Sequence, residues 1–361
     1  MNSREITRFF KGVAILSVFI CHSHQSFTLP GSLNYFFSFF QVGVQLFMLV
    51  SGMGLCFSYH KTPVRWCTFM KKRLAKIAVL YWFAIALAAA YRTAYAFVTH
   101  SDMLQALNLP GILFNALFLH GLSPDSTINN HIVRGGWFIG TLVLYYALFP
   151  LLYRLYFNPK RIWAKYRVYL FPLSIFAAST CLYALMRHYR LPDSLFHLVS
   201  QLSPFCLGLP LFDLQRNNAV NRIKHPFYKC SFFALLALVL YFAQLPIATF
   251  YIFSIFIAFF YAFLGAIQHF QGSTPISKRS PILTILNAVG EHSFPVYLTH
   301  SYIAFDLCAI ARSLLTGIYA NDLLWFVLLQ PFVIALSYSF GKLFHQAVNL
   351  FLKKAAALRR T

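Results

Sequence analysis

A histidine at a fixed spacing behind a cation is the feature of this chain most suited to chemistry. Ten residues, of which only Ser17 is polar, separate Lys11 from His22. If this run is a membrane-crossing helix, Lys11 lies near one face and His22 lies ~16 Å further in. A titratable imidazole at such depth is costly and indicates a functional site. Because imidazole acts as a base or a nucleophile near neutral pH, we predict that His22 is catalytic. The alternative is a histidine in a helix–helix contact, hydrogen-bonded to serine or backbone.

The composition predicts the class of protein that must position this histidine. The chain has 361 residues, is 59% hydrophobic and only 11% charged, and has a mean hydropathy of +0.63. Its apolar runs are long and do not alternate with period two, which argues against a β-barrel. The seven cysteines show no paired spacing and lie mostly in apolar runs, so we expect neither a metal site nor a disulfide framework. These features predict an all-α, polytopic membrane helix bundle.

Runs of spanning length predict about ten transmembrane helices. They fall near 8–27, 36–59, 74–99, 137–157, 168–187, 196–212, 228–243, 247–270, 284–310 and 322–352. We interpret 1–361 as a single transmembrane domain without a fused soluble domain. The basic N-terminus resembles a signal peptide, but no cleavage site follows it, so we keep it as the first membrane helix.

The charge distribution predicts the orientation. With ten spans and a cytoplasmic N-terminus, the inner segments hold 25 of the 30 Lys and Arg residues, as the positive-inside rule requires. Both termini are then cytoplasmic. The net charge of +22 is explained by loops beside anionic lipid, so a nucleic-acid partner is not predicted. A full span at 103–120 would invert every later loop, so we predict a short re-entrant or interfacial helix there.

Five segments carry a family resemblance. The first is the cation–His spacing itself, and the second is GVQLFMLVSGM, which contains Gln45. The third is Arg73-Leu-Ala-Lys76, which an aromatic pair follows. The fourth contains Trp137 and Tyr146, and the fifth is GEHSFPVYLTH, which ends at His300.

These segments resemble the membrane acyltransferase family 3, whose members O-acylate cell-surface sugars and other acceptors by using acyl-CoA. Three positions depart from the family pattern. Leu142 stands where the fourth segment of the family has a glutamate. Lys11 stands where the family has arginine, and Gln45 stands where an acidic residue is common, which removes a candidate charge partner for His22.

The resemblance implies an O-acyltransferase of the plasma (inner) membrane, most simply an acetyltransferase. Acyl-CoA is then a co-substrate from the cytosol, and no cofactor is bound. Its phosphates would be bound by the cytoplasmic cations Lys11, Lys72, Arg73 and Lys76. A glycan acceptor would approach from the outer side, where Trp137, Arg134 and His131 offer stacking and hydrogen bonds. We assign acceptor or supporting roles to Gln45, Trp137, Tyr146 and His300.

Several alternatives stay open. The cationic run at 61–76 is also what topology alone would produce, and Trp137 is also a candidate interface anchor. A transporter or flippase would use the same cationic mouth to hold a phosphorylated or lipid-linked substrate, although paired Gly/Pro interruptions typical of inverted repeats are not found. An acyltransferase acting on a small molecule, a lipid or a peptide, or working with a partner protein, fits the sequence as well.

Overall fold

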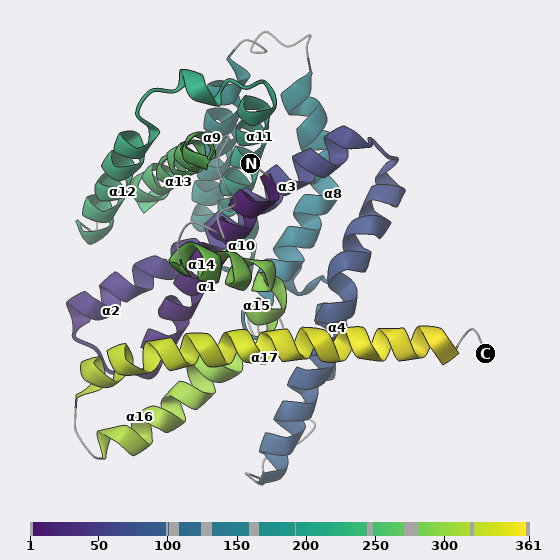
Figure 1. Cartoon of the computed structure of the whole chain (residues 1–361), viewed down its shortest axis with the longest axis vertical. Helices are drawn as coiled ribbons and strands as arrows, with labels where there is room; N and C mark the ends of the chain where they lie inside the picture. Colours follow the sequence, from purple (N-terminus) through teal and green to yellow (C-terminus); the bar gives the residue numbers. More distant parts are fainter. Residues whose placement is uncertain are drawn as a thin grey trace. The chain divides into compact units, whose positions relative to one another are not determined.

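The structure, a computed structural model, describes residues 3–98, 100, 108–123, 132–158, 166–191, 193–243, 248–270, 281–317 and 321–358. Within these ranges every regular element is a helix and no strand occurs. A helix satisfies its own backbone hydrogen bonds, which a membrane-spanning segment requires. The predicted all-α class is therefore confirmed (Figure 1).

Eight helical segments in the described ranges are long and apolar enough to cross a membrane. Two further apolar helices are shorter, so the set agrees with a polytopic bundle of about ten membrane helices. The helices used below are α1 (Ser3–Ser23), α3 (Gly43–Lys61), α4 (Trp66–Val98), α6 (Leu109–Ala116), α8 (Trp137–Phe157), α9 (Arg167–His188), α11 (Leu202–Arg216), α12 (Pro226–Phe242), α13 (Ala248–Phe270), α14 (Pro281–Glu291), α15 (Ser293–Ser301), α16 (Cys308–Thr316) and α17 (Asp322–Leu358).

A short helix, α6, occurs inside the segment predicted at 103–120. The side chain of Asn108 accepts a hydrogen bond from the backbone N–H of Gly111 at 3.1 Å and so caps the helix, and Pro110 follows at a position that tolerates it. Eight residues extend ~12 Å, which is too short for a ~30 Å hydrocarbon core. Residues 101–107 lie outside the described ranges, and the position of α6 relative to the bilayer stays a prediction.

The chain divides into two compact units. The first unit comprises Met1–Ala14, Val42–Met70 and Thr141–Gly290, and the second comprises Ile15–Gln41, Lys71–Gly140 and Glu291–Thr361. The helices α1, α4 and α8 each contribute to both units. The expectation of a single membrane domain stays a prediction.

In the first unit, α3 and α11 cross at glycines. A methyl group added at Gly52 would lie 2.0 Å from the carbonyl oxygen of Phe205, and one at Gly208 would lie 2.2 Å from the backbone nitrogen of Met53. Small residues let helix backbones approach closely where large apolar side chains gain little over lipid. In the same unit, α12 and α13 lie side by side (Figure 1).

The close crossing predicts how much one substitution on α3 destabilises the protein, and the same helix offers a matched control. Gly52→Ala should destabilise the protein by about 1–3 kcal/mol, because the added methyl group forces the backbones apart. Gly54→Ala should be neutral or stabilise by up to ~1 kcal/mol, since nothing lies within 4 Å of the added methyl group. The melting temperatures of the two purified variants in detergent measure the difference. Equal melting temperatures would contradict the close crossing.

The first unit also contains a buried ion pair. The carboxylate of Asp213, on α11, is 2% exposed. Arg167 on α9 donates to both of its oxygens, at 2.8 and 2.9 Å. The Tyr156 hydroxyl of α8 and the Asn217 amide each donate one further bond, at 3.0 Å. Four donors compensate the buried charge, so the network joins three helices without leaving an unpaired ion.

The second unit is organised around the segment from α15 to α17. A π-helix, η6 (Tyr302–Leu307), connects α15 to α16. The long helix α17 packs closely against α15, where a methyl group added at Gly341 would lie 2.6 Å from the Cα of Val296 (Figure 1). A buried apolar cluster lies beside these helices and consists of Phe27, Leu29, Ile303, Cys308, Phe326 and Val333.

Candidate active site

The end of α1 places His22 and fixes the residues around it. His22 lies in the last turn of α1 and is half-buried. The Ser23 hydroxyl donates to the side-chain oxygen of Gln330 on α17 at 3.1 Å. The Ser26 hydroxyl lies 3.2 Å from the carbonyl oxygens of both Ala304 and Phe305 in η6. The helix end that carries His22 is therefore attached to two other elements of the second unit.

His22 contacts His300 directly. Its Nδ1 lies 2.6 Å from Nε2 of His300, a residue 278 positions later in the sequence. The two ring planes differ by only 14°, so the rings meet edge to edge in nearly one plane. His300 belongs to α15 and is 0% exposed. The structure thus joins the catalytic candidate of the first segment to the last residue of the fifth segment.

The hydrogen-bond partners determine the tautomers of the neutral pair. Nδ1 of His300 lies 2.5 Å from the carbonyl oxygen of Tyr297, and a carbonyl oxygen can only accept. Nδ1 of His300 therefore carries the proton, and its Nε2 must accept from Nδ1–H of His22. This leaves an unprotonated Nε2 on His22. Among the described residues, none hydrogen-bonds to this nitrogen.

His24 differs from His22 although it lies only two positions away. It is 1% exposed, its Nδ1 lies 3.2 Å from the Ile20 carbonyl oxygen, and its Nε2 lies 3.3 Å from the Ser38 hydroxyl. Both ring nitrogens are thus bound within the protein. His24 has the contacts of a structural histidine.

Hydrogen bonds hold the short loop 132–136, which precedes α8, next to this pair. The Tyr297 hydroxyl donates to the carbonyl oxygen of Gly135 at 2.7 Å. Gly135 has a φ of +76°, a left-handed conformation that favours glycine. The carbonyl oxygen of Gly136 lies 2.5 Å from Nε2 of His120, a fully buried residue. Tyr297 therefore makes two hydrogen bonds in the site: its carbonyl oxygen accepts from His300, and its hydroxyl donates to the loop.

His120 supports this loop as a neutral donor. Burial lowers the pKa of His120, although its hydrogen bonds to the backbone of Gly136 and Phe114 oppose the shift. A neutral ring with the proton on Nε2 satisfies the Gly136 carbonyl oxygen. The Tyr81 hydroxyl lies 3.4 Å from the same nitrogen and donates to the side-chain oxygen of Asn115 at 2.7 Å.

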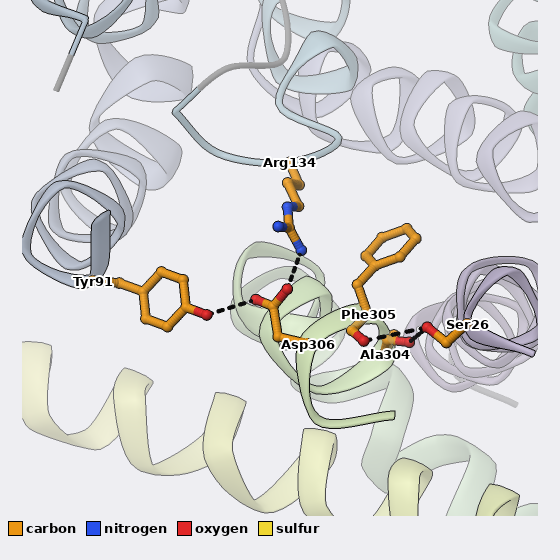
Figure 2. A network of polar contacts seen from close by, with 6 residues as sticks. All are labelled: Ser26, Tyr91, Arg134, Ala304, Phe305 and Asp306. Atoms are coloured by element: carbon orange, nitrogen blue, oxygen red, sulfur yellow. Dashed lines mark hydrogen bonds and ion pairs between the residues drawn. The ribbon is translucent and has the colours of Figure 1, made fainter. Parts of the chain in front are cut away.

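A group of polar side chains surrounds Asp306 in η6 (Figure 2). Nη1 of Arg134 lies 2.6 Å from Oδ1 of Asp306 in η6, and the Tyr91 hydroxyl of α4 donates to Oδ2 at 3.1 Å. The ring of Phe305 lies near both the histidine and this group. Its centre lies 5.1 Å from that of the His22 ring and 5.5 Å from the guanidinium carbon of Arg134.

The structure places the other predicted site residues as follows. Lys72, Arg73 and Lys76 lie in the first turns of α4, and Lys72 and Lys76 are exposed. Trp137 is the first residue of α8 and directly follows the loop 132–136. These four residues belong to the second unit with His22 and His300. His131 lies outside the described residues.

Lys11, Gln45 and Tyr146 belong to the first unit and are half-buried. A glycine follows Lys11 for a packing reason, since a methyl group at Gly12 would lie 2.0 Å from the carbonyl oxygen of Leu286 on α14. Their roles, and those of the other predicted site residues, stay predictions.

Sequence reasoning missed the tautomer-setting carbonyl of Tyr297 and the ion pair of Arg134 with Asp306. A backbone carbonyl leaves no signal in side-chain types. Asp306 did leave a signal in the sequence, because an acidic residue in an apolar run is costly and indicates function. The sequence did not show that Arg134 is its partner.

The fold and the site together define a polytopic helical membrane protein with a histidine pair between its first helix and a late helix. The family model described as an acyltransferase domain, that of acyltransferase family 3, matches residues 8–342. The chain belongs to this family, as its motifs predicted, and is thus a membrane acyltransferase in the general sense of that family. Comparison with curated proteins and with solved structures finds no match.

Proposed function

We propose that this protein is an O-acyltransferase of the inner membrane. It moves an acyl group, acetyl in the simplest case, from cytosolic acyl-CoA to a hydroxyl group of an envelope polysaccharide or lipid-linked glycan. The observation that supports this most is the unprotonated Nε2 of His22, held in place through His300. Such a nitrogen suits a base that activates a hydroxyl group.

The reaction follows from this arrangement. The acceptor hydroxyl gives its proton to Nε2 of His22 while its oxygen attacks the thioester carbonyl carbon. A C–O bond forms, the C–S bond breaks, and the proton passes to the departing thiolate of CoA. The same lone pair would let His22 act as a nucleophile that holds the acyl group in transit. In both routes His300 keeps the proton of His22 on Nδ1.

The cations of α4 are the candidates for donor binding in the second unit. Helix α4 carries Lys72, Arg73 and Lys76 in its first turns. It reaches Tyr91, a member of the polar group of Figure 2, 15 residues or ~22 Å beyond Lys76. In the predicted topology the cations are cytoplasmic, where acyl-CoA occurs. An arginine offers a planar set of donors to phosphate, while lysine acts as a point charge.

Arg73→Gln should raise the KM for acetyl-CoA about tenfold, because one charge-assisted contact to a phosphate is lost. S-acetylpantetheine, which lacks the nucleotide phosphates, should show an unchanged KM. Initial rates of thiol release at varied donor concentration measure both values. An equal rise for the two donors would mean that Arg73 supports the fold or topology and does not bind phosphate.

The proposal is tested by turnover of the purified protein in nanodiscs. We expect release of CoA from acetyl-CoA, slow in water and faster with a hydroxyl acceptor, together with recovery of the acylated acceptor. Propionyl-CoA and palmitoyl-CoA test the acyl preference. If no acyl-CoA is turned over, and the protein in proteoliposomes instead takes up a phosphorylated or lipid-linked substrate, the transporter alternative replaces the proposal.

A further inference from the structure

The ion pair of Arg134 with Asp306 is adjacent to the proposed catalytic histidine. The Phe305 ring lies near both the His22 ring and the Arg134 guanidinium, and Phe305 directly precedes Asp306 in η6. Ser26, four residues after His22, bonds to the backbone of the same π-helix. The position of the pair is therefore linked to that of His22 through the contacts of Phe305 and of Ser26, the latter drawn in Figure 2.

Stability does not account for this pair. The Arg134 side chain is 46% exposed and that of Asp306 is 23% exposed, and ion pairs at such exposure contribute ~0–1 kcal/mol. The loop that carries Arg134 is already held by two hydrogen bonds, from Tyr297 to the Gly135 carbonyl oxygen and from His120 to the Gly136 carbonyl oxygen. Two charges in a mostly apolar chain thus occupy a place where packing does not need them.

The two side chains retain hydrogen-bonding capacity. A carboxylate accepts about four hydrogen bonds, and Asp306 receives one from Arg134 and one from Tyr91 among the described residues. A guanidinium has five N–H donors, and one of them is bound to Asp306. The pair therefore offers acceptors and donors next to each other, with aromatic rings of Phe305 and Tyr91 beside them.

We infer that Arg134 and Asp306 bind the acceptor through two neighbouring hydroxyl groups. One hydroxyl donates to the Asp306 carboxylate, and the adjacent one accepts from the Arg134 guanidinium. The pair is neutral as a whole, so it fits an uncharged polyhydroxyl ligand better than an anion, which Asp306 repels. This inference rests on the proposed function and deepens it, because it assigns the residues that present a hydroxyl of the acceptor to Nε2 of His22.

The acyl step stays as described above. The reacting hydroxyl loses its proton to His22, its oxygen forms the ester bond, and CoA leaves as the thiol. The role of Arg134 and Asp306 is to hold the acceptor, so their loss should change how the acyl group is divided between acceptor and water.

The test measures this division with defined probes. Methyl α-D-glucopyranoside carries neighbouring hydroxyl groups, cyclohexanemethanol has a ring of the same size and one hydroxyl, and D-glucuronate adds a negative charge. For the wild type we expect the ratio of acylated probe to hydrolysed acetyl-CoA to be at least ~10-fold higher with the glucoside than with cyclohexanemethanol. Asp306→Asn and Arg134→Lys should each remove most of this preference.

The matched control is the second ion pair of the same unit. Arg312 binds Asp322 at 2.8 Å with a similarly exposed arginine, and its Nη2 lies 2.6 Å from the Thr28 hydroxyl. Asp322→Asn should leave the ratio and the total release of CoA unchanged. Each purified variant is compared with the wild type by size-exclusion chromatography and melting temperature, which identifies misfolded protein.

The outcomes separate the two proposals. A wild type that releases no CoA from any acyl-CoA overturns the proposed function and this inference with it. A wild type that releases CoA without preferring the glucoside, or variants that keep the preference, overturns the inference alone. A tenfold preference for D-glucuronate would show that the arginines here, including Arg92 near Arg134, form an anion site instead.

Discussion

His22→Ala should lower acyl transfer from acyl-CoA by about 10²- to 10⁴-fold, the range that a positioned general base contributes. The variant removes the ring of His22, whose Nε2 is unprotonated and has no hydrogen-bond partner among the described residues. Nε2 of His300 is also unprotonated, but it already accepts from His22. Binding of acyl-CoA should persist, because the variant leaves all the predicted donor cations in place, Lys11 on α1 and the three on α4. Initial rates of ester formation and of CoA release, with the KM for the donor, measure the effect.

His24 supplies the matched control for this prediction. It lies on the same stretch of chain, but both of its ring nitrogens are bound within the protein. His24→Gln should therefore keep the rate within about tenfold of the wild type. Any loss of rate should be accompanied by a lower melting temperature. Full acylation by His22→Ala, with normal amounts of folded protein, would show that His22 is not the base or nucleophile.

His300→Phe should reduce kcat by about 10- to 100-fold while leaving the KM for acyl-CoA near that of the wild type. Phenylalanine has no acceptor for Nδ1–H of His22, and an unpaired buried donor costs about 1–3 kcal/mol. The ring of His22 would then lose both its fixed orientation and its preferred tautomer. Steady-state kinetics of the purified variant separate kcat from KM.

His300 is a positioning residue, so a conservative variant should restore part of its effect. His300→Gln places an amide oxygen near Nδ1–H of His22, and we expect it to recover part of the activity lost in His300→Phe. Tyr297→Phe keeps the backbone carbonyl that orients His300 and removes the hydroxyl bond to Gly135, so its loss should be smaller. If His300→Phe and His300→Gln are equally inactive and equally unstable, the residue serves the fold alone.

The class of fold and both histidines of the site were predictable from the sequence. Long apolar runs and the placement of basic residues are local properties, and by themselves they indicate a polytopic helical bundle. His22 was predictable because an imidazole eleven residues beyond Lys11 is expensive in an apolar helix. His300 was found by its motif, and the family match over residues 8–342 agrees with the motifs.

The pairings could not be predicted from the sequence. His22 and His300 are separated by 278 positions, and hydropathy does not show which faces of two apolar helices will meet. The same holds for Asp213, whose four donors come from α8, from α9 and from the end of α11. Such contacts depend on the packing of the whole unit, in which each helix presents one of several similar faces.

The π-helix between α15 and α16 makes the length of this segment matter as much as its composition. A π-turn is closed by a hydrogen bond one residue longer than that of an α-turn, so it behaves as a single inserted residue. Deleting one residue within Tyr302–Leu307 would let the segment relax to an α-helix that keeps α15 and α16 in phase, while the residues of the π-helix itself change position. His300 would keep its place, but Asp306 would no longer meet Arg134. Substitutions in this segment are therefore expected to accumulate among descendants of this sequence more readily than insertions or deletions.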